Sequence, residues 1–170
     1  SSSHKWMLAP KGSGLFYIRK EMQERVTPPL LYNGMQVYTG ATGTRNVPTV
    51  LAHGVAMDFH NAIGRDKVEA RCRQLARLVR EQIGGIPGLS CLTPAADELC
   101  GGICTFAVDP AKGSAGQLAG RLQAEYGILV KTAQGTYAYV PAEQAKPRNF
   151  NAMRISTHVY NTEEHVLRVA

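Results

Sequence analysis

The chain has 170 residues, of which 44% are hydrophobic and 19% are charged, a composition typical of one globular domain rather than of a disordered segment. Nineteen Lys and Arg residues against thirteen Asp and Glu residues give a net charge of +6, which suits nucleic acid, a membrane surface or an acidic ligand. Because the apolar runs are short, we expect neither a membrane-spanning helix nor a signal peptide in this chain.

The first elements are expected to be a short strand and a loop. Residues 11–14 have the composition of a turn, and the aromatic tract at 15–18 predicts a strand directly after it. Because this strand has no earlier partner strand, the sequence resembles the C-terminal part of something longer. Residues 30–46 are rich in Gly, Thr, Asn and Tyr and are expected to form an irregular loop.

Two helices should follow, at 47–63 and 65–83. Asn46 is expected to cap the first helix and Gly64 to end it. The second helix carries much of the positive charge between apolar residues at helical spacing, which is typical of the solvated face of an amphipathic helix. No aromatic residues are interleaved with these cations, so we expect no nucleic-acid partner.

The rest of the chain predicts strands more often than helices. In order, we expect strands at 88–93 and 103–108, a helix from Ser114 to about Tyr126, strands at 128–130, 136–140 and 153–159, and a last helix capped by Asn161 with Glu164. Ser114 and Gln117 have the spacing of a capping box. This order predicts an α+β fold with helices on one face of a mostly antiparallel sheet.

The four cysteines do not have metal-ligand spacing. Cys72 lies on the apolar side of the second helix, where a core thiol is expected, and the others are Cys91, Cys100 and Cys104. No C-x-x-C pair occurs and no His lies near Cys100 or Cys104, so we expect no metal site. Free thiols are typical of a reducing compartment, and we expect a cytoplasmic location.

The segment Ser2-Ser3-His4-Lys5-Trp6 could carry chemistry. A lysine amine with a lowered pKa forms Schiff bases with carbonyl compounds, and a neighbouring hydroxyl and imidazole can bind phosphate. A Ser-rich chain end is, by itself, equally typical of a frayed terminus or a tag remnant. The residues that follow decide between these two interpretations.

Four motifs occur in a recognisable order along the chain. They are His4-Lys5-Trp6 followed by Pro10-Lys11-Gly12-Ser13-Gly14 and a strand, Gly43-Thr44-Arg45-Asn46 before a helix, Arg154-Ile155-Ser156 in a late strand, and Tyr160-Asn161-Thr162-Glu163-Glu164 before the last helix. Together they resemble the class V aminotransferase group of pyridoxal 5'-phosphate (PLP) enzymes, which includes cysteine desulfurases and isopenicillin N epimerases. The resemblance covers nearly the whole chain and the C-terminal half of such an enzyme.

The resemblance implies a role for each matching residue. Lys5 would form the Schiff base with PLP and then move protons at the substrate Cα. Ser2 and His4 would contact the cofactor phosphate, and Thr44 would reach the phosphate in the neighbouring subunit of a homodimer. Arg154 would hold the substrate carboxylate in a bidentate grip. From the residues alone, Thr44 is better explained as part of the loop before a helix, and Arg154 as an exposed strand residue.

The resemblance implies an enzyme that acts on an amino acid by epimerisation, transamination or elimination at C–S or Cβ. Residues 127–141 contain no cysteine, which counts against a desulfurase that forms a persulfide there. In the family, the carboxylate that binds the pyridinium nitrogen precedes the lysine, and this chain has no residues there to supply it. The alternative from the residues is a non-catalytic basic α+β module that binds an anionic ligand or a partner chain.

The expected fold class is therefore α/β with α+β, the C-terminal part of a fold-type I PLP-dependent transferase. Residues 1–46 would end the large cofactor-binding domain, residues 47–84 would be linking helices, and residues 85–170 would form the small α+β domain. An amino acid is the expected substrate, and neither nucleic acid nor a membrane is an expected partner.

Overall fold

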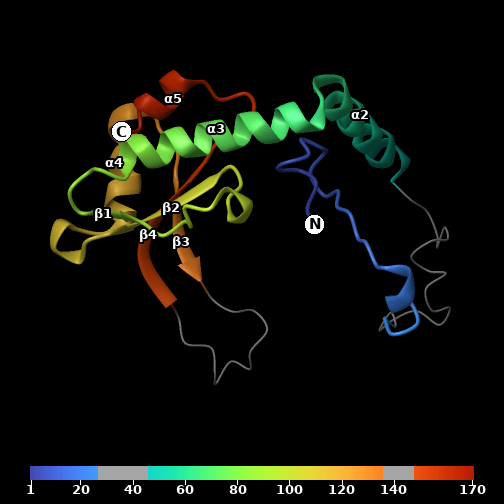
Figure 1. The fold of residues 1–170 in the computed structure, drawn as a ribbon, viewed down its shortest axis with the longest axis horizontal. Helices are drawn as coiled ribbons and strands as arrows, with labels where there is room; N and C mark the ends of the chain where they lie inside the picture. The colour runs from blue at the N-terminus through green and yellow to red at the C-terminus, as the bar shows by residue number, and fades with distance from the viewer. Residues whose placement is uncertain (27–45, 136–147) are drawn as a thin grey trace. The chain divides into compact units, whose positions relative to one another are not determined.

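A computed structural model describes residues 1–26, 46–135 and 148–170 of the chain. Within them the chain divides into two compact units, Ser1–Arg65 and Asp66–Ala170, which are described separately below (Figure 1). The expected loop at 30–46, apart from Asn46, and the expected strand at 136–140 lie outside the described residues. The predicted three-part division of the chain stays a prediction.

The first unit begins with an irregular segment instead of the expected strand at 15–18. Residues 15–19 pair with no strand in the described part of the chain, and the only bridge there joins Ser2 to Gly14. The prediction was wrong because a strand needs a partner strand for its backbone groups, and the described residues place none beside this tract; Leu15 bonds to Ser1 instead. A 3₁₀ helix, η1, covers Lys20–Met22.

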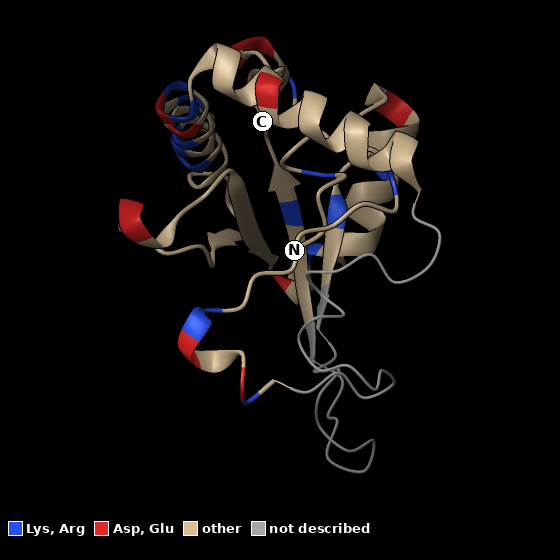
Figure 2. Ribbon diagram, turned by 90° about the vertical axis from the view of Figure 1, so that its right-hand side faces the viewer, with Lys and Arg blue, Asp and Glu red and all other residues tan. Residues whose placement is uncertain are grey.

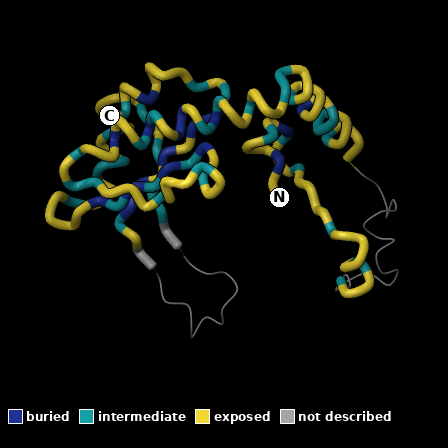
Figure 3. The backbone as a smooth tube through the Cα atoms, viewed as in Figure 1, coloured by how far each residue is buried: buried dark blue, intermediate teal, exposed yellow. Residues whose placement is uncertain are grey.

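Helix α2, Val47–Ile63, completes the first unit and confirms the first predicted helix. The side chain of Asn46 accepts a hydrogen bond from the Thr49 backbone N–H at 3.2 Å, and Gly64 ends the helix at φ +96°. Most of α2 is exposed in Figure 3, including large apolar side chains such as Val50, Leu51 and Val55.

Helix α3, Arg65–Ile83, leads into the second unit and confirms the second predicted helix. Its apolar residues recur at helical spacing, and those of one face are buried: Cys72, Leu75, Ala76, Val79 and Ile83. Gly84 follows directly, and a Cβ there would lie 2.5 Å from the Arg80 carbonyl oxygen, so any other residue would clash with the end of the helix.

The second unit contains one antiparallel sheet of four strands. These are β1 (Leu89–Cys91), β2 (Ile103–Val108), β3 (Lys131–Gly135) and β4 (Arg148–Ser156), in the spatial order β1-β2-β4-β3. Burial alternates along β2, where Cys104, Phe106 and Val108 are buried and the residues between them are half-buried. The alternation shows that one face of the sheet carries the core.

Three helices supply the other side of that core. These are α3, α4 (Ala115–Tyr126) and α5 (Glu163–Leu167), and two short 3₁₀ helices, η2 (Asp97–Leu99) and η3 (Pro110–Lys112), lie in the connections. The core cluster joins residues of the helices to residues of β2 and β4: Leu75, Ala76, Val79, Ile83, Cys104, Phe106, Val108, Ala115, Met153, Ile155 and Val166. The predicted arrangement, helices on one face of an antiparallel sheet, is confirmed.

Three details of the second unit differ from the sequence-based expectations. Residues 128–130 form no strand, because the Ile128 N–H still bonds to Leu122 O at the end of α4, and pairing with β4 starts at Lys131. β4 begins at Arg148 and ends at Ser156, so it starts earlier and ends earlier than predicted. The cap of α5 is Thr162, whose hydroxyl accepts from His165 N–H, while Asn161 accepts from His158 N–H instead.

None of the helices in the described ranges combines the length and the apolar character needed to cross a membrane.

Candidate functional site

The segment that contains Lys5 is closed into a loop by antiparallel backbone hydrogen bonds. Leu15 N–H donates to Ser1 O at 2.8 Å, and Ser3 N–H donates to Ser13 O at 3.1 Å. Between these rungs Ser2 pairs with Gly14. Both ends of the loop are therefore fixed within one short stretch of chain, which holds residues 4–12 between them.

Two tight turns shape the loop. Leu8 N–H donates to Lys5 O at 3.0 Å, with Leu8 at φ +56°, so Lys5 begins the first turn. The second turn runs from Pro10 to Ser13, and Gly12 at φ +83° takes the position that requires a positive φ in a type II turn. Gly12 of the predicted turn at residues 11–14 thus has a definite conformational role.

Three of the predicted site residues lie together in this loop. The side chains of Ser2, His4 and Lys5 are all exposed. Their chemistry fits a phosphorylated aldehyde, because a hydroxyl and an imidazole can donate to a phosphate and an amine can bond to an aldehyde carbon.

The sequence analysis missed Ser3, which lies between them and is fully buried. Its backbone is fixed twice, by the bond to Ser13 O and by Ala9 N–H donating to Ser3 O at 3.1 Å. Its Oγ has no hydrogen-bond partner among the described residues. A buried hydroxyl without a partner is costly, and a polar ligand in the loop would satisfy it. The loop therefore fits a polar cofactor, and no local sequence pattern marks Ser3, because its burial depends on the backbone bonds to Ala9 and Ser13.

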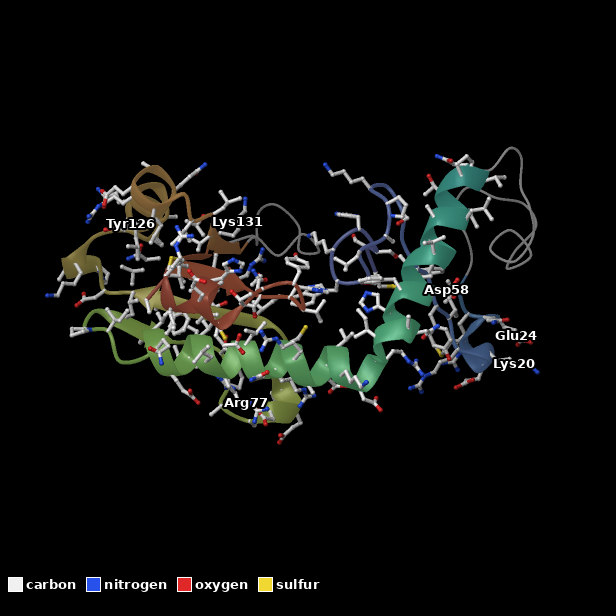
Figure 4. All side chains as sticks on the ribbon, turned by 90° about the horizontal axis from the view of Figure 1, so that it is seen from above. Lys20, Glu24, Asp58, Arg77, Tyr126 and Lys131 are labelled. Carbon is white, nitrogen blue, oxygen red and sulfur yellow. The ribbon has the colours of Figure 1, made fainter. Side chains whose placement is uncertain are left out.

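The other two predicted site residues do not belong to this loop. Thr44 lies outside the described residues. Arg154 is on β4 in the second unit, exposed, between the buried Met153 and Ile155. It therefore lies on the sheet face opposite to the core, opposite Thr105 of β2 on one side and Lys131 of β3 on the other. Figure 4 labels Lys131 on its strand.

Several arginines of the basic helix α3 bind other residues of the second unit. Arg80 donates to Pro94 O at 2.8 Å, Arg73 donates to Asp97 O at 2.9 Å, and Arg77 pairs with Asp97 at 3.6 Å (Figure 4). Figure 2 shows acidic as well as basic residues on this helix. The helix is therefore a poor candidate for binding an anionic partner, because these guanidinium groups already bind the connection between β1 and β2.

The two most buried cysteines are not suited to nucleophilic chemistry. Burial raises the pKa of Cys104 to about 11, and it also raises the pKa of Cys72. Cys104 Sγ contacts Ala76 O at 3.2 Å inside the core. Within the described ranges, no group of three or more His, Cys, Asp or Glu residues is placed to hold a metal ion.

Comparisons of the sequence with known proteins agree on one family. A family model for class-V aminotransferases matches residues 1–169. Isopenicillin N epimerase from Amycolatopsis lactamdurans is 29% identical over 191 residues, which cover 99% of this chain and 44% of that protein. A probable cysteine desulfurase from Mycobacterium leprae is also 29% identical, covering 99% of this chain and 42% of that protein. The chain thus spans less than half the length of these relatives.

Solved structures agree on the fold. A cysteine desulfurase from Thermococcus onnurineus NA1 has a TM-score of 0.73 at 22% identity and covers 97% of this chain and 43% of that one. A cysteine desulfurase from Escherichia coli has a TM-score of 0.71 at 23% identity, and the match covers 99% of this chain and 43% of that one. The described units are therefore part of a fold-type I architecture, as the sequence predicted.

Proposed function

Because the chain belongs to the class-V aminotransferase family, whose members depend on PLP, we propose that it carries the cofactor-binding and substrate-binding residues of an enzyme acting on an amino acid. Its relatives include an epimerase, desulfurases and a probable hercynylcysteine sulfoxide lyase. The proposal rests on one observation above all: an exposed Ser2, His4 and Lys5 in a doubly closed loop beside the buried, unpartnered Ser3 hydroxyl.

Lys5 is the proposed catalytic residue. The chemistry supplied by bound PLP is an electron sink that acidifies the Cα–H bond of an amino acid. Lys5 would hold the cofactor through its amine, and the same amine, once the substrate amine has displaced it, would accept the proton from the substrate Cα. The turn that starts at Lys5 fixes its backbone, so the amine is presented from a defined position.

The neighbours of Lys5 are proposed to hold the cofactor phosphate. Ser2 and His4 offer a hydroxyl and an imidazole on the exposed side of the segment, and the Ser3 hydroxyl supplies one more donor from the buried side. Thr44 is proposed to reach the phosphate of a neighbouring subunit, which requires a homodimer. Hydroxyl groups and loop-to-helix junctions bind phosphate well because both present hydrogen-bond donors.

Arg154 is the proposed substrate carboxylate contact. Its guanidinium forms no ion pair with an acidic residue in the described part of the chain. A planar guanidinium donates two parallel hydrogen bonds to a carboxylate, which fixes the orientation of the substrate Cα. The reaction that follows is epimerisation, transamination or elimination. The absence of cysteine from residues 127–141 speaks against a persulfide-forming desulfurase.

Reductive trapping tests the assignment of Lys5. We expect the purified chain mixed with PLP to absorb visible light, and borohydride followed by peptide mass mapping to find the pyridoxyl group on Lys5. Lys5→Ala should lose this adduct, and Ser2→Ala and His4→Ala should need more PLP to reach it. The matched control is Lys11→Ala, an exposed lysine in the same loop.

The adduct must be specific to support the proposal. Free PLP reacts slowly with any exposed amine, so labelling spread evenly over Lys5, Lys11 and the other exposed lysines would contradict it. An adduct on Lys5 that survives competition by inorganic phosphate without any loss would contradict the phosphate contacts of Ser2 and His4.

A further inference from the structure

Three residues form one row across the exposed face of the sheet. The strand register places Arg154 of β4 opposite Thr105 of β2 and opposite Lys131 of β3. Residues directly opposite one another on antiparallel strands have Cβ atoms about 5 Å apart. The guanidinium of Arg154 and the ammonium of Lys131 are therefore carried by neighbouring positions. The hydroxyl of Thr105 is carried by the position on the other side of Arg154.

Among the described residues, the two cations of this row have no acidic partner. The strands β2, β3 and β4 contain no Asp or Glu. Ion pairs in the described ranges involve Arg71, Arg73, Arg77, Arg80 and Arg121, and neither Lys131 nor Arg154 is among them. Like charges directly opposite each other destabilise a sheet. This arrangement is better explained by an anionic ligand than by folding. Figure 2 shows the basic segments on the strands.

The next row of the same face consists of small residues. Two positions further along, Ala152 of β4 lies opposite Ala107 of β2 and Ala133 of β3. Ala152 is buried and the other two alanines are half-buried, whereas Arg154 and Lys131 in the neighbouring row are exposed. The two cations therefore stand exposed beside an apolar row, where the carbon chain of a ligand with two anionic groups would meet no competing charge.

We propose that Lys131 is a specificity-determining residue that binds a second anionic group of the substrate, so that the substrate class is amino acids with an acidic side chain. The inference rests on the proposed function, because Arg154 takes the α-carboxylate. The two side chains suit different tasks: the fork of Arg154 fits one carboxylate in a fixed orientation, while the Lys131 ammonium is a compact charge on a flexible stem. Lys131 lies directly opposite Arg154, so its ammonium can reach the side-chain carboxylate of an amino acid whose α-carboxylate Arg154 holds.

Titration of the whole chain with L-glutamate and L-glutamine tests this inference. The two amino acids have nearly the same size and differ in the charge of the side chain. Backbone amide shifts of β3 and β4, followed by NMR, give the affinity for each without any cofactor. We expect glutamate to bind about tenfold more tightly than glutamine, the size of one charge-assisted hydrogen bond.

Substitutions distinguish the binding role of Lys131 from that of Arg154. Lys131→Gln should remove the preference for glutamate and leave the affinity for glutamine unchanged, and Lys131→Arg should restore it. Arg154→Gln should lower the affinity for both glutamate and glutamine. Lys67→Gln, an exposed lysine on α3, is the matched control for the loss of one positive charge and should change nothing.

The outcomes distinguish the inference from the proposed function. A glutamate preference that survives in Lys131→Gln, equal binding of the two amino acids, or no binding of either overturns the role of Lys131. Unchanged affinities in Arg154→Gln overturn instead the carboxylate contact on which the proposed function depends. The Lys5 adduct is independent of both results, so failure at Lys131 leaves the assignment of Lys5 standing.

Discussion

Arg71 joins α3 to α5 through three hydrogen bonds. Its guanidinium donates to both Glu163 carboxylate oxygens, at 2.5 and 2.9 Å, and to Asn161 O at 3.1 Å. These hydrogen bonds with Arg71 lower the pKa of Glu163 to about 2. A bidentate pair fixes geometry better than most exposed ion pairs, because both side chains are held in one orientation.

Replacing Glu163 with Gln should make the free energy of unfolding less dependent on pH at acidic pH. A depressed folded-state pKa contributes stability that is complete above the unfolded-state pKa of about 4.3 and is lost as pH falls through the folded-state value of about 2. We expect Glu163→Gln to be less stable than the original chain at pH 7, with the difference shrinking between pH 4 and 2. Urea denaturation at a series of pH values measures this, and Glu164→Gln is the control.

Asn151 links three elements with one side chain. Its Oδ1 accepts from Ala115 N–H at 2.8 Å, and its Nδ2 donates to Val108 O at 2.8 Å and to Gly113 O at 3.1 Å. Its backbone has φ +39°, a region in which Asn is more tolerated than other residues with a Cβ. The start of α4 and the end of β2 are therefore fixed to β4 by this one residue.

Asn151→Ala should destabilise the chain by about 2–3 kcal/mol, because it removes three hydrogen bonds and leaves three backbone groups without them. Asn151→Asp keeps the acceptor for Ala115 N–H but turns a carboxylate oxygen toward the carbonyl oxygens of Val108 and Gly113, so we expect it to be at least as destabilised as Asn151→Ala at neutral pH. Chemical denaturation monitored by circular dichroism gives both values. Equal stability of all three proteins would contradict the linking role of Asn151.

A capping box stabilises the N-terminus of helix α4. Ser114 Oγ accepts from Gln117 N–H at 3.2 Å, and the Gln117 side chain accepts from Ser114 N–H at 3.0 Å. Gly127 ends the helix in the left-handed region at φ +67°. We expect Ser114→Ala to cost about 1 kcal/mol and Ser114→Thr to cost less, since threonine keeps the hydroxyl. The free energy of unfolding in urea measures this difference, and a loss in Ser114→Thr as large as in Ser114→Ala would contradict the capping role.

The helices could be predicted because their signals are local. The cap at Asn46, the capping box at Ser114 and the apolar spacing of α3 are all readable within a few residues of sequence. The cap of α5 was assigned to Asn161 instead of Thr162, because adjacent Asn and Thr are both good caps and only the backbone decides between them.

The strand limits and part of the candidate site could not be predicted, because they depend on contacts between distant residues. β3 begins at Lys131 because Arg154 lies opposite it, a pairing that no local pattern reveals. For the same reason the sequence did not predict that Lys131 lies beside Arg154. Ser3 was missed because its burial depends on backbone bonds to Ala9 and Ser13.

At the scale of the whole molecule, the two units differ in how much core they contain. All residues of the core cluster belong to Asp66–Ala170. In the described part of Ser1–Arg65, only Ser3, Ala9 and Ala56 are buried, while large apolar side chains such as Phe16 and Leu51 are mostly exposed (Figure 3). Burial of apolar area is the main source of stability, so the second unit should be far more stable.

The single tryptophan makes this difference measurable, because Trp6 lies in the first unit. We expect far-ultraviolet circular dichroism, which the helices and sheet of the second unit dominate, to show a cooperative thermal transition. Trp6 fluorescence should change earlier and more gradually. A chain of residues 65–170 should retain the circular dichroism midpoint, because it keeps the complete core. Coincident transitions for the two probes in the whole chain would instead mean that the units unfold as one, and the loop around Lys5 would then share the stability of the sheet.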